Sequence, residues 1–314
     1  MAAPDRPPEG PLQMPEPRFP TMTIRGLDVR WAERTRVMGI LNATPDSFSG
    51  DGLLARNASR EAFVDAAVAR GLGLLQDGAD ILDVGGESTR PGSTPVSAEE
   101  ELARVIPVIE GLRRATDARI SVDTYRAAVA RAALDAGADL VNDVWGLQMD
   151  PEMAPLVAER QVPVILMHNR SKPKDAAQEE RLGGRYVGVR YDDLIADVIR
   201  ETDALVQHAV RAGIPRERII VDPGIGFGKT VPQNLYLLNH LDALRALGYP
   251  ILLGSSRKSF IGYTLDLGPE ERVEGTAATV AVGIVRGAHI VRVHDVRPMV
   301  RVARMTDAIL RATL

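Results

Sequence analysis

Carboxylate and amide side chains occur where several short apolar runs of the sequence end. Asp123, Asn142 and Asp222 each lie at or directly after such a run. Each of them alone could cap a following helix. Together they offer the acceptors and donors that bind a flat heterocycle with alternating N–H groups and ring nitrogens, as in the edge of guanine. If the runs are strands whose ends meet, these residues predict a binding site for such a ring.

Cationic side chains occur at comparable positions. Arg292 and His294 alternate along one apolar run, so in a strand they point the same way. An arginine beside a histidine makes an anion site, and phosphate is the default anion. Lys258 lies in a glycine- and serine-rich segment, although only four of the 38 lysines and arginines are lysine. This setting favours a functional Lys258 over a solvated loop lysine.

The composition excludes several classes of function. The chain has no cysteine, which excludes thiol nucleophiles, iron–sulfur clusters, thiolate zinc sites and disulfides. Its net charge of −4 gives no basic surplus for nucleic acid or a membrane surface. No window approaches 18 consecutive apolar residues. Residues 1–20 contain seven prolines and no apolar run, which predicts a disordered tail rather than a signal peptide. We therefore expect a soluble, cytoplasmic protein.

Some familiar motifs fail on inspection. Gly228-Lys229-Thr230 resembles the end of a P-loop, but Pro223 occupies the first required glycine position. No Gly-x-Gly-x-x-Gly follows the first predicted strand of the main pattern, and no His-x-His pair follows it either. A Schiff-base reaction through Lys258 stays open, although such a lysine needs an apolar pocket and here has serine neighbours. His208, His240 and His289 lie in helical or corner positions and are interpreted as structural.

The elements that must position these residues form a repeating pattern. Short aliphatic runs alternate with helical patterns eight times, over about 280 residues, which is typical of a single (β/α)8 TIM barrel rather than a doubly wound sheet. The predicted strands are 37–41, 81–84, 120–122, 140–144, 163–167, 219–221, 251–254 and 290–293. The predicted helices are 60–77, 98–115, 126–136, 151–160, 191–212, 233–247, 270–286 and 298–312.

The rest of the chain is arranged around that barrel. Residues 22–33 predict a short strand, a turn and a second strand, so the expected organisation is a tail over 1–20 and one barrel domain over 21–314. Residues 169–190 are interpreted as a mobile loop rather than a domain boundary. Working residues of barrels lie at the carboxyl ends of the strands, where the carboxylates, amides and cations described above are found.

Six segments in this order resemble the dihydropteroate synthase family over residues 22–312. They are Gly-Ile-Leu-Asn-Ala-Thr-Pro-Asp-Ser-Phe-Ser (39–49), Gly-Gly-Glu-Ser-Thr-Arg-Pro-Gly (85–92), Ser-Val-Asp-Thr (121–124), Asp-Pro-Gly-Ile-Gly-Phe-Gly-Lys (222–229), Ser-Arg-Lys-Ser-Phe-Ile-Gly (256–262) and Arg-Val-His-Asp-Val (292–296). The resemblance implies condensation of 6-hydroxymethyl-7,8-dihydropterin diphosphate with p-aminobenzoate, which gives 7,8-dihydropteroate and diphosphate.

The resemblance also implies roles for individual residues. The catalytic residues would be Asn42, Lys258, Arg292 and His294. The pterin would be held by Asp123, Asn142, Asp222 and Lys258, with Met167 and Phe227 lining its pocket. Asn42, Arg292 and His294 would bind the diphosphate, and Asn42 would help to hold Mg²⁺. Thr89, Arg90, Pro91 and Ser256 would shape the p-aminobenzoate site, where sulfonamides would compete. A homodimer through the last helices is a further implication.

The first loop departs from the family pattern. Residues 47–52 read Ser-Phe-Ser-Gly-Asp-Gly, so the acidic residue moves one place, to Asp51, and its role is not carried over. Two alternatives to the synthase remain open. One is a paralogue that binds pterin without catalysis, which the shifted Asp51 would support. The other is a methyltetrahydrofolate methyltransferase of the same fold, which would share the pterin acceptors but not need the Thr-Arg-Pro loop, Ser-Arg-Lys or Arg-x-His.

Overall fold

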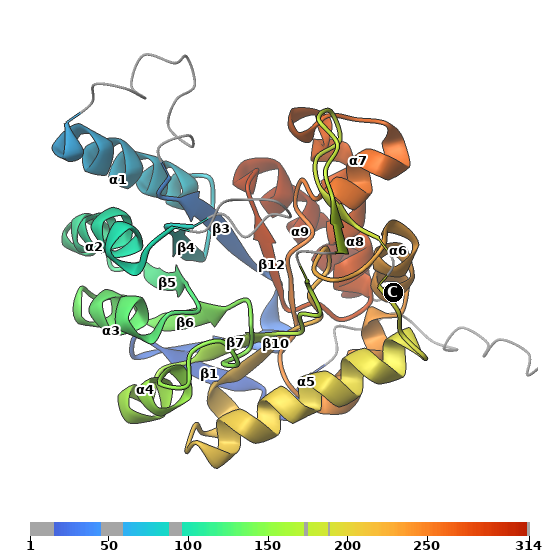
Figure 1. Ribbon diagram of the computed structural model, residues 1–314, viewed down its shortest axis with the longest axis horizontal. Helices are drawn as coiled ribbons and strands as arrows, with labels where there is room; N and C mark the ends of the chain where they lie inside the picture. The colour runs from blue at the N-terminus through green and yellow to red at the C-terminus, as the bar shows by residue number, and fades with distance from the viewer. Residues whose placement is uncertain (1–15, 45–58, 88–95, 173–174, 188, 313–314) are drawn as a thin grey trace, which may run out of the picture.

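Eight parallel strands form the centre of the molecule in the computed structural model, which describes residues 16–44, 59–87, 96–172, 175–187 and 189–312 (Figure 1). The strands are β3 (Arg36–Asn42), β4 (Ile81–Gly85), β5 (Arg119–Asp123), β6 (Leu140–Asp143), β7 (Val164–Met167), β10 (Ile219–Asp222), β11 (Leu252–Leu253) and β12 (Ile290–Val293). Their order is β10-β7-β6-β5-β4-β3-β12-β11, and a bridge between Val221 and Ile251 joins the two ends of that order. The predicted barrel is confirmed.

Helices surround the strands (Figure 1). They are α1 (Arg60–Gln76), α2 (Ala98–Ala115), α3 (Ala127–Asp135), α4 (Met153–Arg160), α5 (Leu194–Arg211), α6 (Val231–Asn239), α7 (Ser259–Leu265), α8 (Val273–Val285) and α9 (Val296–Leu310). Side-chain caps at Ser59, Ser97, Asp193 and Thr230 explain where four of them begin. Of the helices described, none is both long enough and apolar enough to cross a membrane.

The helix pattern differs from the prediction in two places. The predicted helix 233–247 is divided at His240 into α6 and a 3-10 segment, Leu241–Leu247. The helix α7 was not predicted, because its seven residues are too few to show a helical period. Since α7 begins directly after Lys258, it is part of the support for the candidate site.

The two faces of the barrel strands belong to separate hydrophobic clusters. One face packs against the surrounding helices and includes Leu41, Leu82, Val122 and Leu166. The other face points into the barrel, where Met38, Ile81, Leu140, Ile165, Ile220, Leu252 and Ile290 form an apolar layer. Strands buried on both faces are therefore aliphatic at successive positions, as the sequence shows.

An N-terminal hairpin closes the floor of this interior layer. Strands β1 (Thr21–Ile24) and β2 (Leu27–Arg30) pair antiparallel, and positive φ angles at Arg25 and Gly26 form the two-residue turn between them. Met22, Ile24, Val29 and Trp31 join the interior cluster, and Trp31 is fully buried. The predicted hairpin is confirmed, and it seals the amino-terminal end of the barrel.

The expected tail is described only from residue 16 onwards, and residues 1–15 lie outside the described residues. Pro17 is buried, and the Arg18 backbone N–H donates to Gly248 O at 2.9 Å. The Phe19 and Tyr249 rings lie 6.0 Å apart between centroids. Residues 16–20 therefore contact the barrel, in contrast to the disorder expected for them.

The long connection at 169–190 contains short secondary structure. Strands β8 (Ala176–Ala177) and β9 (Arg185–Tyr186) pair antiparallel. The connection contacts α7, because the Tyr263 hydroxyl donates to Gly183 O at 3.1 Å and Arg181 forms an ion pair with Asp266. It joins β7 to α5.

Candidate active site

Polar residues form the second layer of the barrel interior. Two positions beyond the apolar layer, towards the carboxyl ends of the strands, the inward face carries Asp83, Asn142, Met167, Asp222, Gly254 and Arg292. The alternation of strand side chains places them on the same face as the residues beneath. Asp123 pairs in register with Asn142 and with Gly85, which is two residues beyond Asp83, so Asp123 lies beside Asn142 and nearer the mouth than Asp83. The predicted convergence of Asp123, Asn142, Asp222 and Arg292 is confirmed.

Arg292 is at the centre of this layer. Its Nε donates to Asp83 Oδ2 and its Nη2 donates to Asp123 Oδ2, both at 2.6 Å. Burial disfavours the charge on Arg292, but the two carboxylates outweigh burial and raise its pKa. Burial raises the pKa of Asp123 to about 7, although the Arg292 charge acts in the opposite direction. The layer is thus a desolvated ion-pair cluster at the mouth of the barrel.

Asp83 is a member of this cluster that was not among the predicted site residues. Its Oδ2 also accepts a hydrogen bond from Asn142 Nδ2 at 3.0 Å. The sequence does not single out Asp83, because it lies inside the apolar run Ile81-Leu82-Asp83-Val84, which predicts a strand. A carboxylate at an inward position of a strand buried on both faces is the signal that could have identified it.

Lys258 follows β11, and its side chain reaches the loop that follows β10. Its Nζ donates to Ile225 O, and the ammonium is 4.4 Å from the centroid of the Phe227 ring. Burial lowers the pKa of Lys258 to about 8, while Asp222 acts to raise it. The structure therefore places Lys258, Asp222 and Phe227 together, and Lys258 is not a solvated loop lysine.

Asp222 ends β10 and shapes the loop after it. Its Oδ1 accepts a hydrogen bond from the Gly224 N–H at 2.7 Å. Burial raises the pKa of Asp222, and Lys258 acts against that shift. The capping alternative considered for this residue type does not apply, because the N-caps of α3, α4 and α6 are Arg126, Glu152 and Thr230.

His294 and Ser256 form a second pair at the mouth of the barrel. The His294 backbone N–H donates to Ser256 Oγ at 3.1 Å, and His294 Nδ1 is also 3.1 Å from Ser256 Oγ. The neighbouring Arg257 forms two hydrogen bonds with the Asp295 carboxylate, at 2.8 and 2.7 Å. Two adjacent strand ends, after β11 and β12, are thus joined where the predicted anion-binding residues lie.

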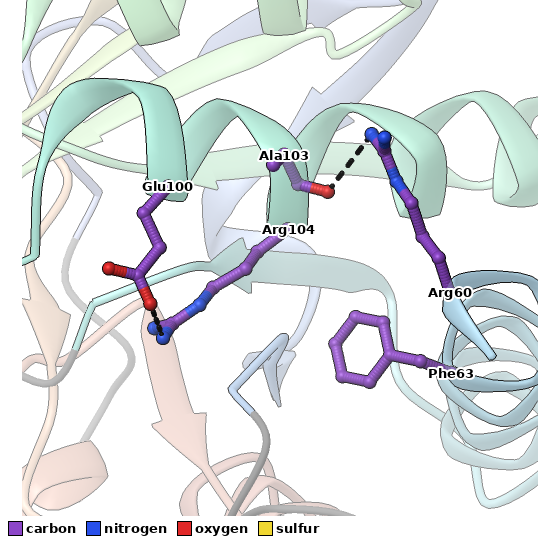
Figure 2. Close-up of a pocket in the computed structure, with 5 residues that line it drawn as sticks. All are labelled: Arg60, Phe63, Glu100, Ala103 and Arg104. Carbon is purple, nitrogen blue, oxygen red and sulfur yellow. Dashed lines mark hydrogen bonds and ion pairs between the residues drawn. The ribbon is translucent and has the colours of Figure 1, made fainter. Parts of the chain in front are cut away.

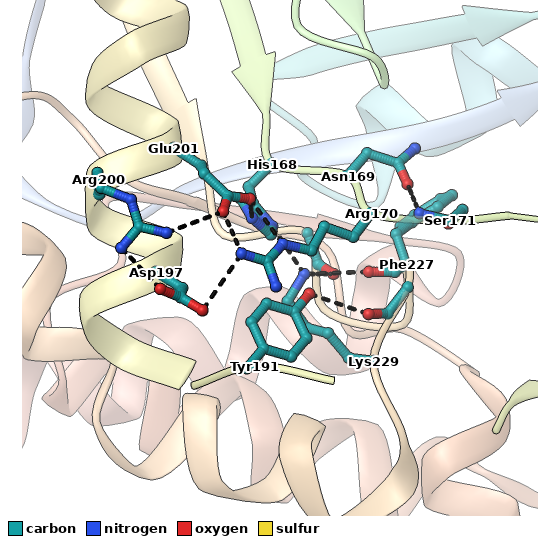
Figure 3. A network of polar contacts seen from close by, with 12 residues as sticks. His168, Asn169, Arg170, Ser171, Tyr191, Asp197, Arg200, Glu201, Phe227 and Lys229 are labelled. Carbon is teal, nitrogen blue, oxygen red and sulfur yellow. Dashed lines mark hydrogen bonds and ion pairs between the residues drawn. The ribbon is translucent and has the colours of Figure 1, made fainter. Parts of the chain in front are cut away.

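Lys229 organises the loop that carries Phe227 (Figure 3). Its side chain is 1% exposed, and its Nζ donates to Gly224 O and Phe227 O, both at 3.0 Å. A third contact, also 3.0 Å, joins Nζ to His168 Nδ1. Burial lowers the pKa of Lys229 to about 7. Gly228-Lys229-Thr230 lacks the first glycine of a P-loop, and in the structure Lys229 binds loop carbonyl oxygens instead.

His168 extends this network to α5 (Figure 3). Its Nε2 is 2.9 Å from Glu201 Oε2, and Glu201 also forms an ion pair with Arg170. Burial lowers the pKa of His168 to about 4, so the ring is neutral near pH 7. We assign the Nε2–H tautomer, because Nδ1 then accepts from Lys229 and Nε2 donates to Glu201. The network anchors the loop after β10 on the loop after β7.

The other predicted site residues are only partly described. Asn42 ends β3, in register with Gly85, and Met167 is buried at the end of β7. Both therefore lie at the mouth of the barrel. Thr89, Arg90, Pro91 and the shifted Asp51 lie outside the described residues.

Arg126 connects the residues that flank the segment 88–95. It forms ion pairs with Glu87 and Glu101, and its Nη2 donates to Val96 O at 2.8 Å. Glu87 precedes the segment, whereas Val96 follows it. One guanidinium thus fixes both ends of the connection in which Arg90 occurs.

A cavity of about 230 Å³ lies apart from these residues, between α1 and α2 (Figure 2). It is lined by Arg60, Phe63, Glu100, Ala103 and Arg104. Arg60 donates to Ala103 O, and Arg104 pairs with Glu100, so the charged groups of the wall bind one another or the backbone. None of the predicted site residues that the structure describes lines it, and the chemistry is expected at the mouth of the barrel instead.

The sequence is similar to known proteins over most of its length. The model of the pterin-binding enzyme family matches residues 38–294. Dihydropteroate synthase of Bacillus subtilis (strain 168) is 48% identical over 280 residues, which cover 89% of this chain and 90% of that protein. The enzyme of Escherichia coli (strain K12) is 41% identical over 276 residues, which cover 88% and 92%.

The structure is similar to solved structures as well. A Xanthomonas albilineans dihydropteroate synthase with 4-aminobenzoic acid matches with a TM-score of 0.82 and 44% identity, over 94% of this chain and 100% of that one. The same organism's enzyme in complex with 7,8-dihydropteroate matches with a TM-score of 0.80 and 41% identity, over 94% and 100%.

Proposed function

Because this chain belongs to the pterin-binding enzyme family and has the dihydropteroate synthase activity of its relatives, we propose that the ion-pair cluster around Arg292 is where the reaction takes place. The enzyme joins p-aminobenzoate to 6-hydroxymethyl-7,8-dihydropterin diphosphate and releases diphosphate and 7,8-dihydropteroate. The observation that carries the proposal is the convergence of Asp123, Asn142, Asp222 and Lys258 around Arg292 in one barrel mouth.

The flat pterin ring binds to the polar layer. Asp123 and Asp222 accept from its N–H edge, Asn142 offers both a donor and an acceptor, and Lys258 donates to a ring oxygen or nitrogen. Met167 and Phe227 line the faces of the ring. The interior face thus offers polar groups for the edge of the pterin ring and apolar side chains for its faces.

The leaving group determines what the cations do. The electron-rich dihydropterin supports positive charge on its exocyclic methylene, so the C–O bond to diphosphate breaks before the amine attacks. Arg292 and His294 stabilise the departing polyanion with charge and hydrogen-bond donors fixed in advance. The nitrogen of p-aminobenzoate then attacks the methylene carbon and loses a proton. An arylamine is already nucleophilic at neutral pH, so no strong general base is needed.

Mg²⁺ fits the donor set as a partner of the diphosphate. The described residues contain no cluster of three or more acidic, histidine or cysteine ligands, and magnesium is commonly held by one or two protein oxygens together with substrate phosphates. Asn42, at the end of β3, offers an amide oxygen for this role. When bound, the ion would neutralise charge that develops on the leaving oxygens.

The p-aminobenzoate site is proposed at the outer part of the same mouth. The contacts of Ser256 with His294 support its part in this site. Thr89, Arg90 and Pro91 would complete it, and Arg126 fixes the residues on either side of them. Sulfonamides would compete for this position. A cytoplasmic location stays a prediction.

Turnover with and without magnesium tests the reaction and the metal separately. Purified protein with pterin diphosphate, p-aminobenzoate and Mg²⁺ is expected to release diphosphate and form dihydropteroate, measured by coupled assay and chromatography. Chelation with EDTA should lower kcat by about tenfold or more, because the metal stabilises leaving-group charge. No turnover at high enzyme concentration would contradict the synthase, whereas turnover that resists chelation would contradict only the metal.

A homodimer through the last helices is proposed from the exposed apolar residues found there. Met305 and Ile309 are 62% and 60% exposed, and they lie one turn apart on α9. Val282, which is also exposed, lies on α8, and α8 packs against α9. An apolar surface of this kind favours a second copy of the chain as its partner.

Sedimentation equilibrium tests this interface. The wild-type protein is expected at twice its 34.0 kDa chain mass, and the double variant Met305→Asp/Ile309→Asp at 34.0 kDa, because buried charges disfavour association. Leu235→Asp on α6, a comparably exposed apolar position, is the matched control and should stay dimeric. A monomeric wild-type protein at micromolar concentration would refute the dimer.

A further inference from the structure

Asp83 is a buried carboxylate in the middle of β4. Its side chain is 0% exposed, with the apolar Ile81 beneath it and Gly85 above it on the same strand face. Within the described part of the chain this side chain has no surface open to solvent, so a substrate does not touch it in this conformation. Any part it takes in the reaction must act through its neighbours.

Those neighbours are two residues of the proposed pterin and diphosphate sites. A single oxygen, Oδ2, accepts from Arg292 Nε at 2.6 Å and from Asn142 Nδ2 at 3.0 Å. Among the described residues, Oδ1 has no hydrogen-bond partner. A buried carboxylate with one unpartnered oxygen is costly, and an aliphatic side chain such as that of Ile81 would suit the position better if packing were its only purpose.

Asp83 and Asp123 hold Arg292 in different ways. Asp83 binds Nε, which is next to the side-chain stem, whereas Asp123 binds the terminal Nη2. Asp123 is also nearer the mouth, with a side chain 12% exposed. If Asp123 accepts hydrogen bonds from the pterin edge, its hold on Nη2 weakens. The bond from Nε to Asp83 remains, since the substrate does not reach Asp83.

We propose that Asp83 is a positioning residue that keeps Arg292 and Asn142 in place when the substrate engages Asp123. This inference rests on the proposed function of Asp123 and Arg292. With Nε fixed, the guanidinium keeps its plane, and the Nη2–H that Asp123 releases becomes available to the departing diphosphate. Asp123 thus exchanges Arg292 for the pterin, while Asp83 keeps its hydrogen bonds with Arg292 and Asn142.

The variant Asp83→Asn tests this role, because it keeps the size of the side chain and removes its charge. We expect kcat to fall by roughly 30- to 100-fold, since misplacing a charge-stabilising group by about 1 Å can cost about 100-fold. KM for p-aminobenzoate should stay within about twofold of wild type. In an Arg292→Lys background the same substitution should change kcat by no more than about threefold, because Asp83 acts through Arg292.

A second variant and a matched control complete the design. Asp83→Ser shortens the side chain and should lower kcat at least as much as Asp83→Asn. Asp307→Asn changes another buried carboxylate, which binds Thr35 directly before β3, and should lower the melting temperature without changing kcat. Wild-type kcat in Asp83→Asn, effects that multiply with Arg292→Lys, or loss of folding in both Asp83 variants would overturn the inference. Absence of turnover in the wild-type enzyme would instead refute the proposed function.

Discussion

Replacing Arg292 with alanine should lower kcat by about three orders of magnitude, because the substitution removes the main fixed charge proposed for the leaving diphosphate. It also leaves Asp83 and Asp123 without their shared cation in a desolvated layer. Breaking a buried ion pair from one side costs about 3 kcal/mol or more in the free energy of unfolding. Steady-state kinetics and urea unfolding measure the two effects.

Arg292→Lys and Lys258→Ala separate charge from geometry. Lysine at position 292 keeps the positive charge but loses the planar fork that binds two carboxylates, so kcat should fall by roughly 100-fold with a smaller loss of stability. Lys258→Ala should mainly weaken pterin binding, as measured by calorimetry. If Arg292→Ala weakened pterin binding as Lys258→Ala does and left kcat unchanged, the division of roles between these two cations would be wrong.

Gly224→Ala should be among the most disruptive small substitutions in the chain. Gly224 has a φ of +69°, and a Cβ built there would lie 1.8 Å from the His168 carbonyl oxygen, a backbone atom that cannot rotate away. The loop would have to shift, which breaks the contacts of Gly224 with Asp222 and Lys229. We expect a loss of about 3 kcal/mol in the free energy of unfolding and at least roughly 30-fold weaker pterin binding.

Gly73→Ala is the matched control for that substitution. Gly73 lies inside α1, its φ is not positive, and no atom lies within 4 Å of a Cβ built there. Alanine should therefore stabilise the protein by about 0.5 to 1 kcal/mol without changing pterin affinity. Thermal unfolding and calorimetry of both variants provide the comparison. Equal behaviour of Gly224→Ala and Gly73→Ala would show that the close approach of the two loops is unimportant.

The strands were predictable because their physics is local. Most residues of a parallel strand that is buried on both faces are aliphatic, and the run Ile219–Val221 shows this directly. The carboxyl ends then followed from barrel topology, which located Asp123, Asn142, Asp222 and Arg292 in one mouth. The similarity to dihydropteroate synthases agrees with the sequence motifs.

The partners of these residues were not predictable, because they depend on tertiary contacts. Asp83 lies 209 residues from Arg292 in the chain, and its position within an apolar run concealed its charge. Lys229 matched an incomplete phosphate motif, and only the folded loop shows it binding carbonyl oxygens. The helix α7 is too short to show a helical repeat of apolar residues in the sequence. Long-range pairing and short elements are what a single sequence reveals least.

The hairpin under the barrel has a kinetic consequence. Because Trp31 and its neighbours fill the amino-terminal end of the barrel, substrates and products enter and leave through the carboxyl-terminal mouth. A pterin ring that contacts Asn142 occupies the deepest part of this mouth. It must therefore bind before p-aminobenzoate covers that position. The two substrates are therefore expected to enter in sequence, pterin first, and the finished product has to back out by the same route.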